Sequence, residues 1–472
     1  MLDIYSDLFK QLNIENIFYC SWKSNHNLEG FLNGNGDLDL YVSYRDKNKF
    51  ELELSRLGFK VVESYVASYP YVQHYIGLDT KTCKLVHLHV YFKIVTGESN
   101  SKNYIFPLDK WLKRNISGTR EIPTLSDEAQ LVVYLLRFFI KIGSPLSILL
   151  FFRDITKYKE ELNSINAKEV VDLPDFISND CFSELYESFE NDSFFGKLKT
   201  SWKLKRALSG LKRKNTFAHL FYKQKNLVKR VVNKLFLKQK KNLKTGSLIA
   251  ICGLDGSGKS TAVDSLVDFY SQQFTTHIIH IGRPNPTLLT FPFWMVTRIA
   301  ERFKHSKKSE SKSVKEFIPS TNVGIISAFR YFILSYERYQ TAKHALKLVM
   351  KGHVVIADRY PTMSYGKMDS PRILHKEKMG RLYSYFHNKE KKLYQSILPC
   401  DLALHLFVPV EVAIERNRKR IKLGKETDNE IRARYLINSD LLFKSDNYCK
   451  IDATENIEKV RVSLIKTSWN HL

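Results

Sequence analysis

The sequence predicts an α/β protein with two folded domains joined by a helical connector. Its C-terminal half alternates short apolar runs with helical segments, which is typical of a parallel sheet with helices on both faces. Its N-terminal part mixes strand-like and helix-like segments, which indicates an α+β domain. At 472 residues the chain is too long for one core. We place the domains at 1–155 and 246–472 and the connector at 156–245.

The N-terminal elements follow from local patterns. We expect a strand at 39–42, a helix at 46–57 and a longer strand at 84–95. Ser126 is followed by two acids, which predicts the capped start of a helix near Ala129. Residues 131–152 form the longest apolar stretch, but Arg137 and Lys141 fall within it. We therefore expect two buried helices there and no membrane span.

The net charge of +25 is concentrated in the connector. Lysines and arginines recur through 197–244, without an acidic residue. Apolar residues repeat there at helical spacing: Leu227, Val228, Val231, Val232, Leu235 and Phe236. We favour a solvated helical linker whose apolar stripe packs on a neighbouring domain, with peripheral contact of this basic amphipathic helix with an anionic membrane as the alternative. No nucleic-acid-binding motif accompanies the charge, so nucleic acid is not an expected partner.

The six cysteines are scattered, with no spacing typical of zinc or a redox pair. The chain also lacks the pattern of a secretory signal. We therefore expect a cytoplasmic protein, peripheral to the inner face of the membrane if the connector binds lipid. The sequence leaves the oligomeric state open, with a homodimer as one alternative.

A glycine-rich loop in the C-terminal half indicates nucleotide binding. Residues 248–252 predict a buried strand and residues 261–266 a helix. Between them runs Gly253-Leu254-Asp255-Gly256-Ser257-Gly258-Lys259-Ser260, followed by Thr261. Glycines let successive backbone N–H groups face a polyphosphate, and the helix adds its positive end. Lys259 would reach the terminal phosphates of ATP, and Ser260 would hold Mg²⁺.

Three further motifs follow the loop in a fixed order. They are Asp358-Arg359-Tyr360 after an apolar run, an arginine-rich segment with Arg416, Arg418 and Arg420, and Ile451-Asp452-Ala453-Thr454. Together with the loop, this set resembles thymidylate kinase and its relatives over roughly 247–472. The resemblance implies a P-loop kinase fold with a five-stranded parallel sheet, and ATP and Mg²⁺ as cofactors.

The resemblance also implies roles for individual residues. Arg359 would bind the phosphate of a small-molecule acceptor, Asp358 would lie near the transferred phosphate and magnesium, and Asp255 would contact the acceptor sugar. Gly256 stands where one branch of the family carries a catalytic arginine, so the chain resembles the branch that supplies this arginine from its lid. The candidate catalytic residues are Lys259, Asp358, Arg359, Arg416 and Arg420. The candidate nucleotide-binding residues are Gly253, Asp255, Gly256, Ser257, Gly258, Lys259, Ser260 and Thr261.

Two departures from the family concern the acceptor. Residues 280–286 replace its Arg-Glu-Pro-Gly-Gly-Thr-like segment, and residues 361–372 replace its base-reading stretch. Phosphate recognition is therefore supported, while thymine recognition is not. We expect ATP-dependent transfer, as in dTMP kinase, to a nucleoside monophosphate or related metabolite. The alternatives are a bifunctional kinase/nucleotidyltransferase for a sugar or polyol precursor in surface polysaccharide synthesis, and an ATP-dependent switch that transfers nothing.

Two aspartates in the N-terminal domain suggest a second site. Asp37 and Asp39 alternate along a strand, so both fall on one face, which suits magnesium ions. With the turn at 21–24, they resemble the nucleotidyltransferase superfamily, which implies a third acid on a neighbouring strand. Here His87 and His89 occupy that strand. Three interpretations stay open: an active transferase with a histidine-modified metal site, a degenerate nucleotide- or sugar-binding domain, and packed strand residues without a site.

Overall fold

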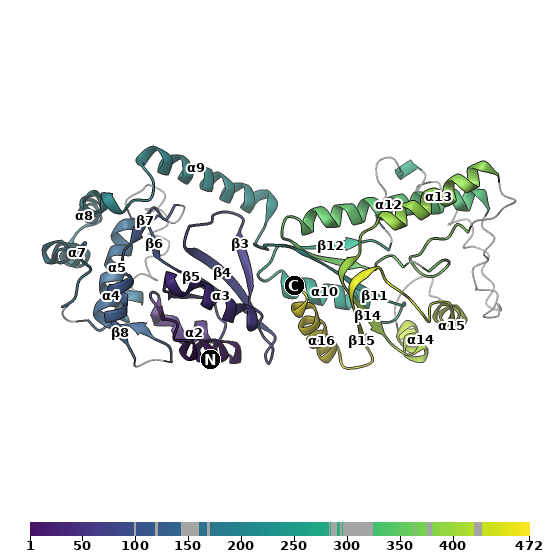
Figure 1. The fold of residues 1–472 in the computed structure, drawn as a ribbon, viewed down its shortest axis with the longest axis horizontal. Coiled ribbons are helices and arrows are strands. Elements are labelled where there is room, and N and C mark those ends of the chain that lie inside the picture. Colours follow the sequence, from purple (N-terminus) through teal and green to yellow (C-terminus); the bar gives the residue numbers. More distant parts are fainter. Residues whose placement is uncertain are drawn as a thin grey trace. The chain divides into compact units, whose positions relative to one another are not determined.

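In the computed structural model the chain folds as two compact units, Met1–Lys241 and Asn242–Leu472 (Figure 1). The structure describes residues 1–98, 101–118, 121–142, 160–167, 170–282, 284, 290–292, 295, 324–362, 364–374, 380–419 and 427–472. The candidate Arg420 and the second helix expected within 131–152 lie outside the described residues.

The second unit is built on a five-stranded sheet in the order β12-β13-β11-β14-β15. The strands are β11 (Ser247–Gly253), β12 (Thr276–His280), β13 (Val354–Asp358), β14 (Cys400–Phe407) and β15 (Ser445–Asp452). Neighbouring strands are parallel throughout, with Ile249 of β11 opposite both Ile356 and Leu402. The described helices are α10 (Lys259–Tyr270), α12 (Ile325–Val349), α13 (Arg381–Ser396), α14 (Val410–Lys419), α15 (Asp428–Ile437) and α16 (Ile457–Asn470).

Figure 1 shows α12 and α13 on one side of this sheet and α10 and α16 on the other. Because both faces are covered, the central strands are buried along their length, and every residue of β11 is buried. This explains why the sequence shows continuous apolar runs here rather than alternation. Parallel strands place their carboxyl ends at one edge, where Gly253 ends β11 and Asp358 ends β13. The predicted parallel sheet with helices on both faces is confirmed.

The first unit holds a mixed sheet with the strand order β3-β4-β5-β2-β1-β9-β8. The strands are β1 (Tyr19–Ser21), β2 (Asp37–Val42), β3 (Lys60–Ser64), β4 (Val72–Asp79), β5 (Lys84–Tyr91), β8 (Ile116–Ser117) and β9 (Thr124–Leu125). Strands β2 and β5 are parallel, and their register sets Asp37 opposite His87 and Asp39 opposite His89. The single strand expected at 84–95 is broken, because β5 ends at Tyr91 and a separate hairpin follows.

That hairpin consists of β6 (Ile94–Thr96) and β7 (Tyr104–Phe106). The described helices of the unit are α1 (Asp3–Ile14), α2 (Leu28–Leu32), α3 (Lys47–Arg56), α4 (Asp109–Arg114), α5 (Asp127–Lys141), α7 (Asn179–Asn191), α8 (Phe194–Ala207) and α9 (Thr216–Val232). Short 3-10 turns are η1 (Asn25–Asn27), η2 (Tyr44–Asp46) and η3 (Leu208–Leu211), and η4 (Asn233–Leu237) is a π-helical turn. The Ser126 hydroxyl accepts a hydrogen bond from the Ala129 N–H at the start of α5, which confirms the predicted cap.

The segment predicted as a connector belongs largely to the first unit. Its residues Leu185, Leu204 and Leu208 are buried in the same core cluster as the apolar face of α5. The division between the units falls at Lys241 and Asn242, at the short strand β10 (Lys241–Leu243). Among the helices in the described ranges, none is long and apolar enough to cross a membrane.

Candidate active site

The phosphate loop connects the buried end of β11 to the first turn of α10. Gly256 and Gly258 both have positive φ angles, of 90° and 91°. A Cβ atom on Gly256 would also lie 3.0 Å from the Cα atom of Ala413 in α14. Glycine is therefore required at 256 by conformation and by space, and an arginine would not fit without a shift of α14.

Lys259 folds back into this loop. Its ammonium donates a hydrogen bond of 2.7 Å to the carbonyl oxygen of Leu254 and lies 3.4 Å from Oδ1 of Asp255. The side chain is 8% exposed, and this burial lowers the pKa of Lys259. Ser260 and Thr261 follow in the first turn of α10 and are exposed. The loop thus surrounds a buried cation beside two exposed hydroxyl groups.

Asp255 accepts hydrogen bonds from two arginines of distant segments. Nη2 of Arg359 lies 2.8 Å from Oδ1, and Nη1 of Arg434 in α15 contacts Oδ2. Burial would raise the pKa of Asp255, but the charges of Lys259, Arg359 and Arg434 outweigh it and lower the pKa to about 2. The carboxylate is therefore ionised and holds three cations around the phosphate loop.

Arg359 directly follows β13 with a positive φ of 69°. Its N–H donates to the carbonyl oxygen of Ile251 in β11, at 3.0 Å. A Cβ atom on Gly282 would lie 2.3 Å from Cδ of Arg359, so any side chain at 282 would force the arginine out of this conformation. The neighbouring Asp358 carboxylate lies 3.3 Å from Nδ1 of His280 in β12. The structure thus brings Arg359 to the phosphate loop, while Asp358 contacts the next strand.

The arginines of α14 separate into different environments. Nη2 of Arg416 donates to the carbonyl oxygen of Ala453 at 2.7 Å, and Nη1 lies 3.4 Å from the carbonyl oxygen of Gly256. Arg416 therefore links the phosphate loop to the Ile451–Thr454 motif. Arg418 instead pairs at the surface with Asp428, the first residue of α15.

Three residues at this site were not singled out from the sequence: Arg338, Asp369 and Arg434. Arg338 in α12 is 6% exposed and donates to Oδ1 of Asp369 at 2.7 Å and to the carbonyl oxygen of Gly282 at 2.8 Å. Oδ2 of Asp369 lies 3.6 Å from Nη1 of Arg359. Charges therefore alternate from Arg338 through Asp369 and Arg359 to Asp255. The arginine-rich sequence around 432–434 could have indicated Arg434, but no local signal marks Arg338.

In the first unit, the predicted aspartates and histidines do lie together. Nδ1 of His87 contacts Asp37, and Nδ1 of His89 lies 2.9 Å from Oδ1 of Asp39. The same Asp39 oxygen is 2.8 Å from the ammonium of Lys23. Within the described ranges, no group of three or more His, Cys, Asp or Glu side chains has an arrangement that could hold a metal ion.

Comparison with known proteins places the chain among its relatives. No protein-family model matches it. The "Uncharacterized ATP-binding protein YghS" of Escherichia coli strain K12 is 30% identical over 174 residues, which cover 36% of this chain and 72% of YghS. The chain belongs to the family of YghS.

This YghS relative is also similar to thymidylate kinases. The enzyme of Fervidobacterium nodosum is 27% identical over 220 residues, covering 45% of this chain and 94% of the kinase. The thymidylate kinase of Blochmanniella floridana is 25% identical over 225 residues, which cover 46% of this chain and 92% of the kinase. A solved thymidylate kinase structure from Candida albicans covers 48% of this chain and 94% of its own, at 20% identity and a TM-score of 0.30. The two sequence matches show that the chain contains a P-loop kinase region of the thymidylate kinase type.

Proposed function

We propose that this YghS relative is an ATP-dependent phosphotransferase that moves the γ-phosphate of ATP to a phosphate-bearing acceptor. The position of Arg359 carries the proposal. Its guanidinium lies between the carboxylates of Asp255 in the phosphate loop and Asp369 beyond β13. A cation at this point can hold an acceptor phosphate next to the phosphate that is transferred, which a protein that only binds ATP does not need.

Phosphoryl transfer depends on alignment and on positive charge around the transferred group. Lys259 and the first turn of α10 would hold the phosphates of ATP, while Arg359, Arg416 and Arg434 would supply further charge. The Ser260 hydroxyl and the Asp358 carboxylate are oxygen donors of the kind that Mg²⁺ prefers. When bound there, Mg²⁺ would neutralise charge on the ATP phosphates.

Asp255 gives the site a defined resting state. Its carboxylate occupies the donors of Lys259, Arg359 and Arg434, so these cations are gathered before any phosphate arrives. Phosphate oxygens can replace the carboxylate as acceptors with little loss of hydrogen bonding. Binding would then require side-chain rotations rather than the recruitment of distant cations.

The acceptor is proposed to differ from dTMP. The segment that replaces the base-reading stretch supplies Met368 and Asp369, and both contact Arg359. Met368 is fixed by its own N–H, which donates to Oδ1 of Asn438 at 2.7 Å. A methionine and a carboxylate would therefore line the acceptor pocket at this position, where an amide side chain would contact a base.

Transfer from γ-labelled ATP to a panel of acceptors tests the function. The panel contains dTMP, other nucleoside monophosphates and sugar phosphates. The wild type is compared with Lys259→Ala and with the control Lys49→Met, which changes an exposed lysine of the first unit. We expect saturable transfer to one acceptor class, lost in Lys259→Ala and kept in Lys49→Met. Robust turnover of dTMP would refute the altered acceptor. ATP hydrolysis that no acceptor stimulates would favour the non-transferring switch.

The bifunctional alternative needs metal-dependent chemistry at Asp37 and Asp39. Both carboxylates are already paired, Asp37 with His87 and Asp39 with Lys23 and His89. Catalysis there would require the metal to displace these partners. We therefore favour the kinase reaction alone.

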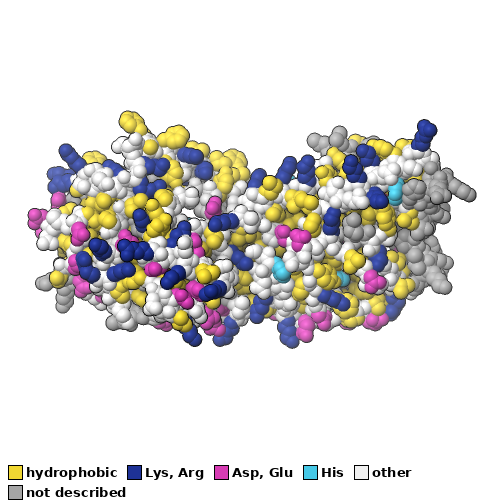
Figure 2. All heavy atoms as spheres, in the orientation of Figure 1, with side chains coloured by type: hydrophobic (Ala, Val, Ile, Leu, Met, Phe, Trp, Pro, Cys, Tyr) yellow, Lys and Arg dark blue, Asp and Glu magenta, His cyan; other side chains and the backbone are white. Residues whose placement is uncertain are grey.

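We further propose that α9 and η4 bind an anionic membrane surface. Large apolar side chains recur along one face of α9 and remain exposed: Phe217, Leu220, Phe221, Val228 and Val231. Leu235 and Phe236 of η4 are exposed as well, at 62% and 76%. Figure 2 shows hydrophobic side chains at the surface over α9. The exposed Lys225, Arg230 and Lys234 lie on the same segment, and this charge complements anionic lipid rather than a neutral apolar partner.

A further inference from the structure

A cluster of cations surrounds Tyr91 at the end of β5 in the first unit. Lys102 donates a hydrogen bond of 2.9 Å to the Tyr91 hydroxyl, and Lys23 approaches the same oxygen at 3.3 Å. Both ammonium groups also lie over the Tyr91 ring, at 5.0 and 5.1 Å from its centre. Two lysines from separate loops thus converge on one phenol oxygen.

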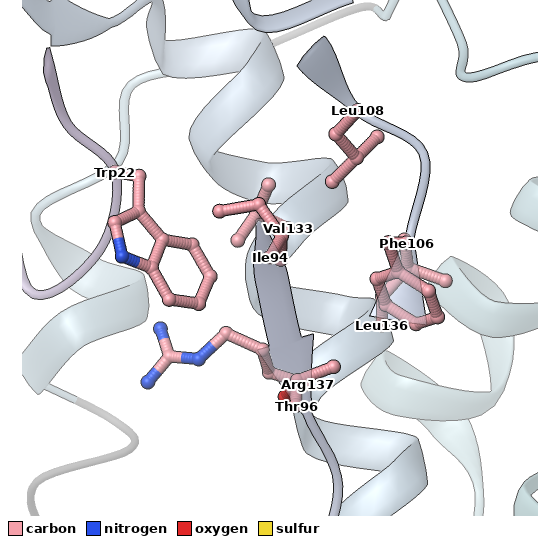
Figure 3. A pocket seen from close by; sticks show the side chains of 8 residues that line it. All are labelled: Trp22, Ile94, Thr96, Phe106, Leu108, Val133, Leu136 and Arg137. Carbon is pink, nitrogen blue, oxygen red and sulfur yellow. The ribbon is translucent and has the colours of Figure 1, made fainter. Parts of the chain in front are cut away.

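Two more cations come from α5. Arg137 is 9% exposed, and its guanidinium lies beside the indole ring of Trp22 (Figure 3), 5.7 Å from the ring centre. Its Nη1 donates to Glu161 at 2.8 Å. Lys141 follows one turn later, at the end of the helix, close enough to Arg137 and Lys23 for their charges to lower its pKa. The cation cluster therefore consists of Lys23, Lys102, Arg137 and Lys141.

Among the described residues, positive charge exceeds negative charge in this cluster, because its four cations face two carboxylates, Asp39 and Glu161. Burial, reinforced by neighbouring cations, lowers the pKa of Lys102 and of Lys141 to about 7. Gathering like charges out of water costs free energy, and a bound anion would offset that cost.

The same geometry disagrees with the metal site implied by the nucleotidyltransferase resemblance. The Lys23 ammonium lies 2.8 Å from Oδ1 of Asp39, and Nδ1 of His89 lies 2.9 Å from the same oxygen. Asp37 is bonded to His87, whose Nε2 lies 3.0 Å from Nδ1 of His74. Mg²⁺ prefers oxygen ligands that are free to coordinate it, and these carboxylates are already committed to nitrogen donors.

We propose that the first unit binds an oxyanion, a phosphate or pyrophosphate group, on Lys23, Lys102, Arg137 and Lys141 without a divalent metal. The lysines would donate to the anion in place of the Tyr91 hydroxyl, and Arg137 offers a planar donor set suited to phosphate. This inference does not depend on the kinase reaction, because every residue named lies in the first unit.

Equilibrium dialysis with labelled pyrophosphate in EDTA tests the proposal. The full chain should carry Lys259→Ala, so that the phosphate loop does not contribute. We expect one equivalent to bind, and the affinity to fall by about tenfold or more in Lys102→Met and in Lys141→Met. Lys49→Met removes an exposed lysine of the same unit and should bind as the parent does. Circular dichroism checks that each variant is folded.

The variant Asp39→Asn distinguishes an anion site from a metal site, because the two predict opposite changes in the affinity for pyrophosphate. Removing this negative charge frees Lys23, so pyrophosphate should bind about tenfold more tightly in EDTA. Binding that requires Mg²⁺ or Mn²⁺ and is lost in Asp39→Asn would overturn the proposal, as would binding unaffected by both lysine variants. Competition by ATP, inorganic phosphate and a sugar phosphate then shows which source of the phosphate group is preferred.

Discussion

Arg434 of α15 contacts the Asp255 carboxylate of the phosphate loop, although 179 residues separate them in the chain. On the other oxygen, Asp255 accepts from Arg359 at 2.8 Å. An aspartate of the nucleotide-binding loop is thus bonded to arginines from two sides. The site is held together by charge before it meets a phosphate.

Asp255→Asn should raise the affinity for ATP. An amide competes less well than a carboxylate for Lys259, Arg359 and Arg434, so more of their binding capacity is available to phosphate. We expect a gain of about tenfold, measured by calorimetry at fixed ionic strength. Asp264→Asn, which alters an exposed residue of α10, is the matched control. A loss of ATP affinity in Asp255→Asn would show that the carboxylate assists binding directly.

Arg359→Met should abolish transfer while leaving ATP binding within a few-fold of wild type. We propose that the guanidinium acts on the acceptor side, and removing such a cation costs on the order of 10³ in kcat. Single-turnover kinetics with the acceptor found in the panel measures the loss. Arg418→Met removes a surface arginine paired with Asp428 and should keep its activity. If Arg359→Met weakens ATP binding as much as turnover, the residue serves the donor instead.

Gly256→Ala should destabilise the second unit. The residue has a φ of 90°, and a Cβ atom would meet Ala413 at 3.0 Å. We expect a loss of about 1–3 kcal/mol in the free energy of unfolding, measured by urea denaturation. Gly380→Ala provides the comparison, because a Cβ there has no neighbour within 4 Å among the described residues. Equal free energies of unfolding for the two variants would mean that α14 shifts to accept the added Cβ without loss of stability.

Sulfate binding to the cation cluster should weaken as the pH rises from 6.5 to 8.5. Lys102 and Lys141 have a pKa of about 7 in the folded protein, so they lose their protons in this range. Sulfate keeps its charge throughout, and it binds the protonated lysines. The affinity should therefore fall with pH, by at most about tenfold per pH unit for each lysine. In Lys102→Met the affinity for sulfate should depend less steeply on pH. An unchanged dependence would mean that groups other than Lys102 titrate.

Removing apolar groups from α9 should release the protein from anionic vesicles. Phe217 and Phe221 are 87% and 74% exposed on one face of the helix. The double variant Phe217→Ser/Phe221→Ser should bind vesicles of mixed phosphatidylcholine and phosphatidylglycerol at least about tenfold more weakly in a sedimentation assay. Ile326→Ser removes an equally exposed apolar side chain of α12 and should bind as wild type does. If the double variant binds vesicles as well as Ile326→Ser does, the apolar stripe of α9 contacts protein rather than lipid.

Local patterns predicted those parts of the fold that neighbouring residues determine. The phosphate loop needs its glycines at fixed positions, and the α5 cap needs only Ser126 and Ala129, so both are readable from short stretches. The parallel sheet also followed from uninterrupted apolar runs such as β11. The extent of the strand expected at 84–95 was wrong, because tertiary packing ends β5 at Tyr91.

The charge pairs could not be predicted in the same way. Arg338 and Asp369 meet because α12 runs past a loop that lies 31 residues further along the chain. Lys23 meets Asp39 only because β1 and β2 pair in the sheet. Spacing along a sequence carries no information on such contacts, so a predicted metal site could not be distinguished from a pair of neutralised carboxylates.

Arg338, Asp369, Arg359 and Asp255 form a continuous series of alternating charges. Each charge contacts at least one opposite charge, so removing one leaves its neighbours, which carry the same sign, without that partner. The free-energy effects of single substitutions will therefore not add, and a double-mutant cycle across Arg338 and Arg359 should show coupling of about 0.5–3 kcal/mol. Such coupling would make these residues one cooperative unit, in which the contribution of any member is defined only relative to the others.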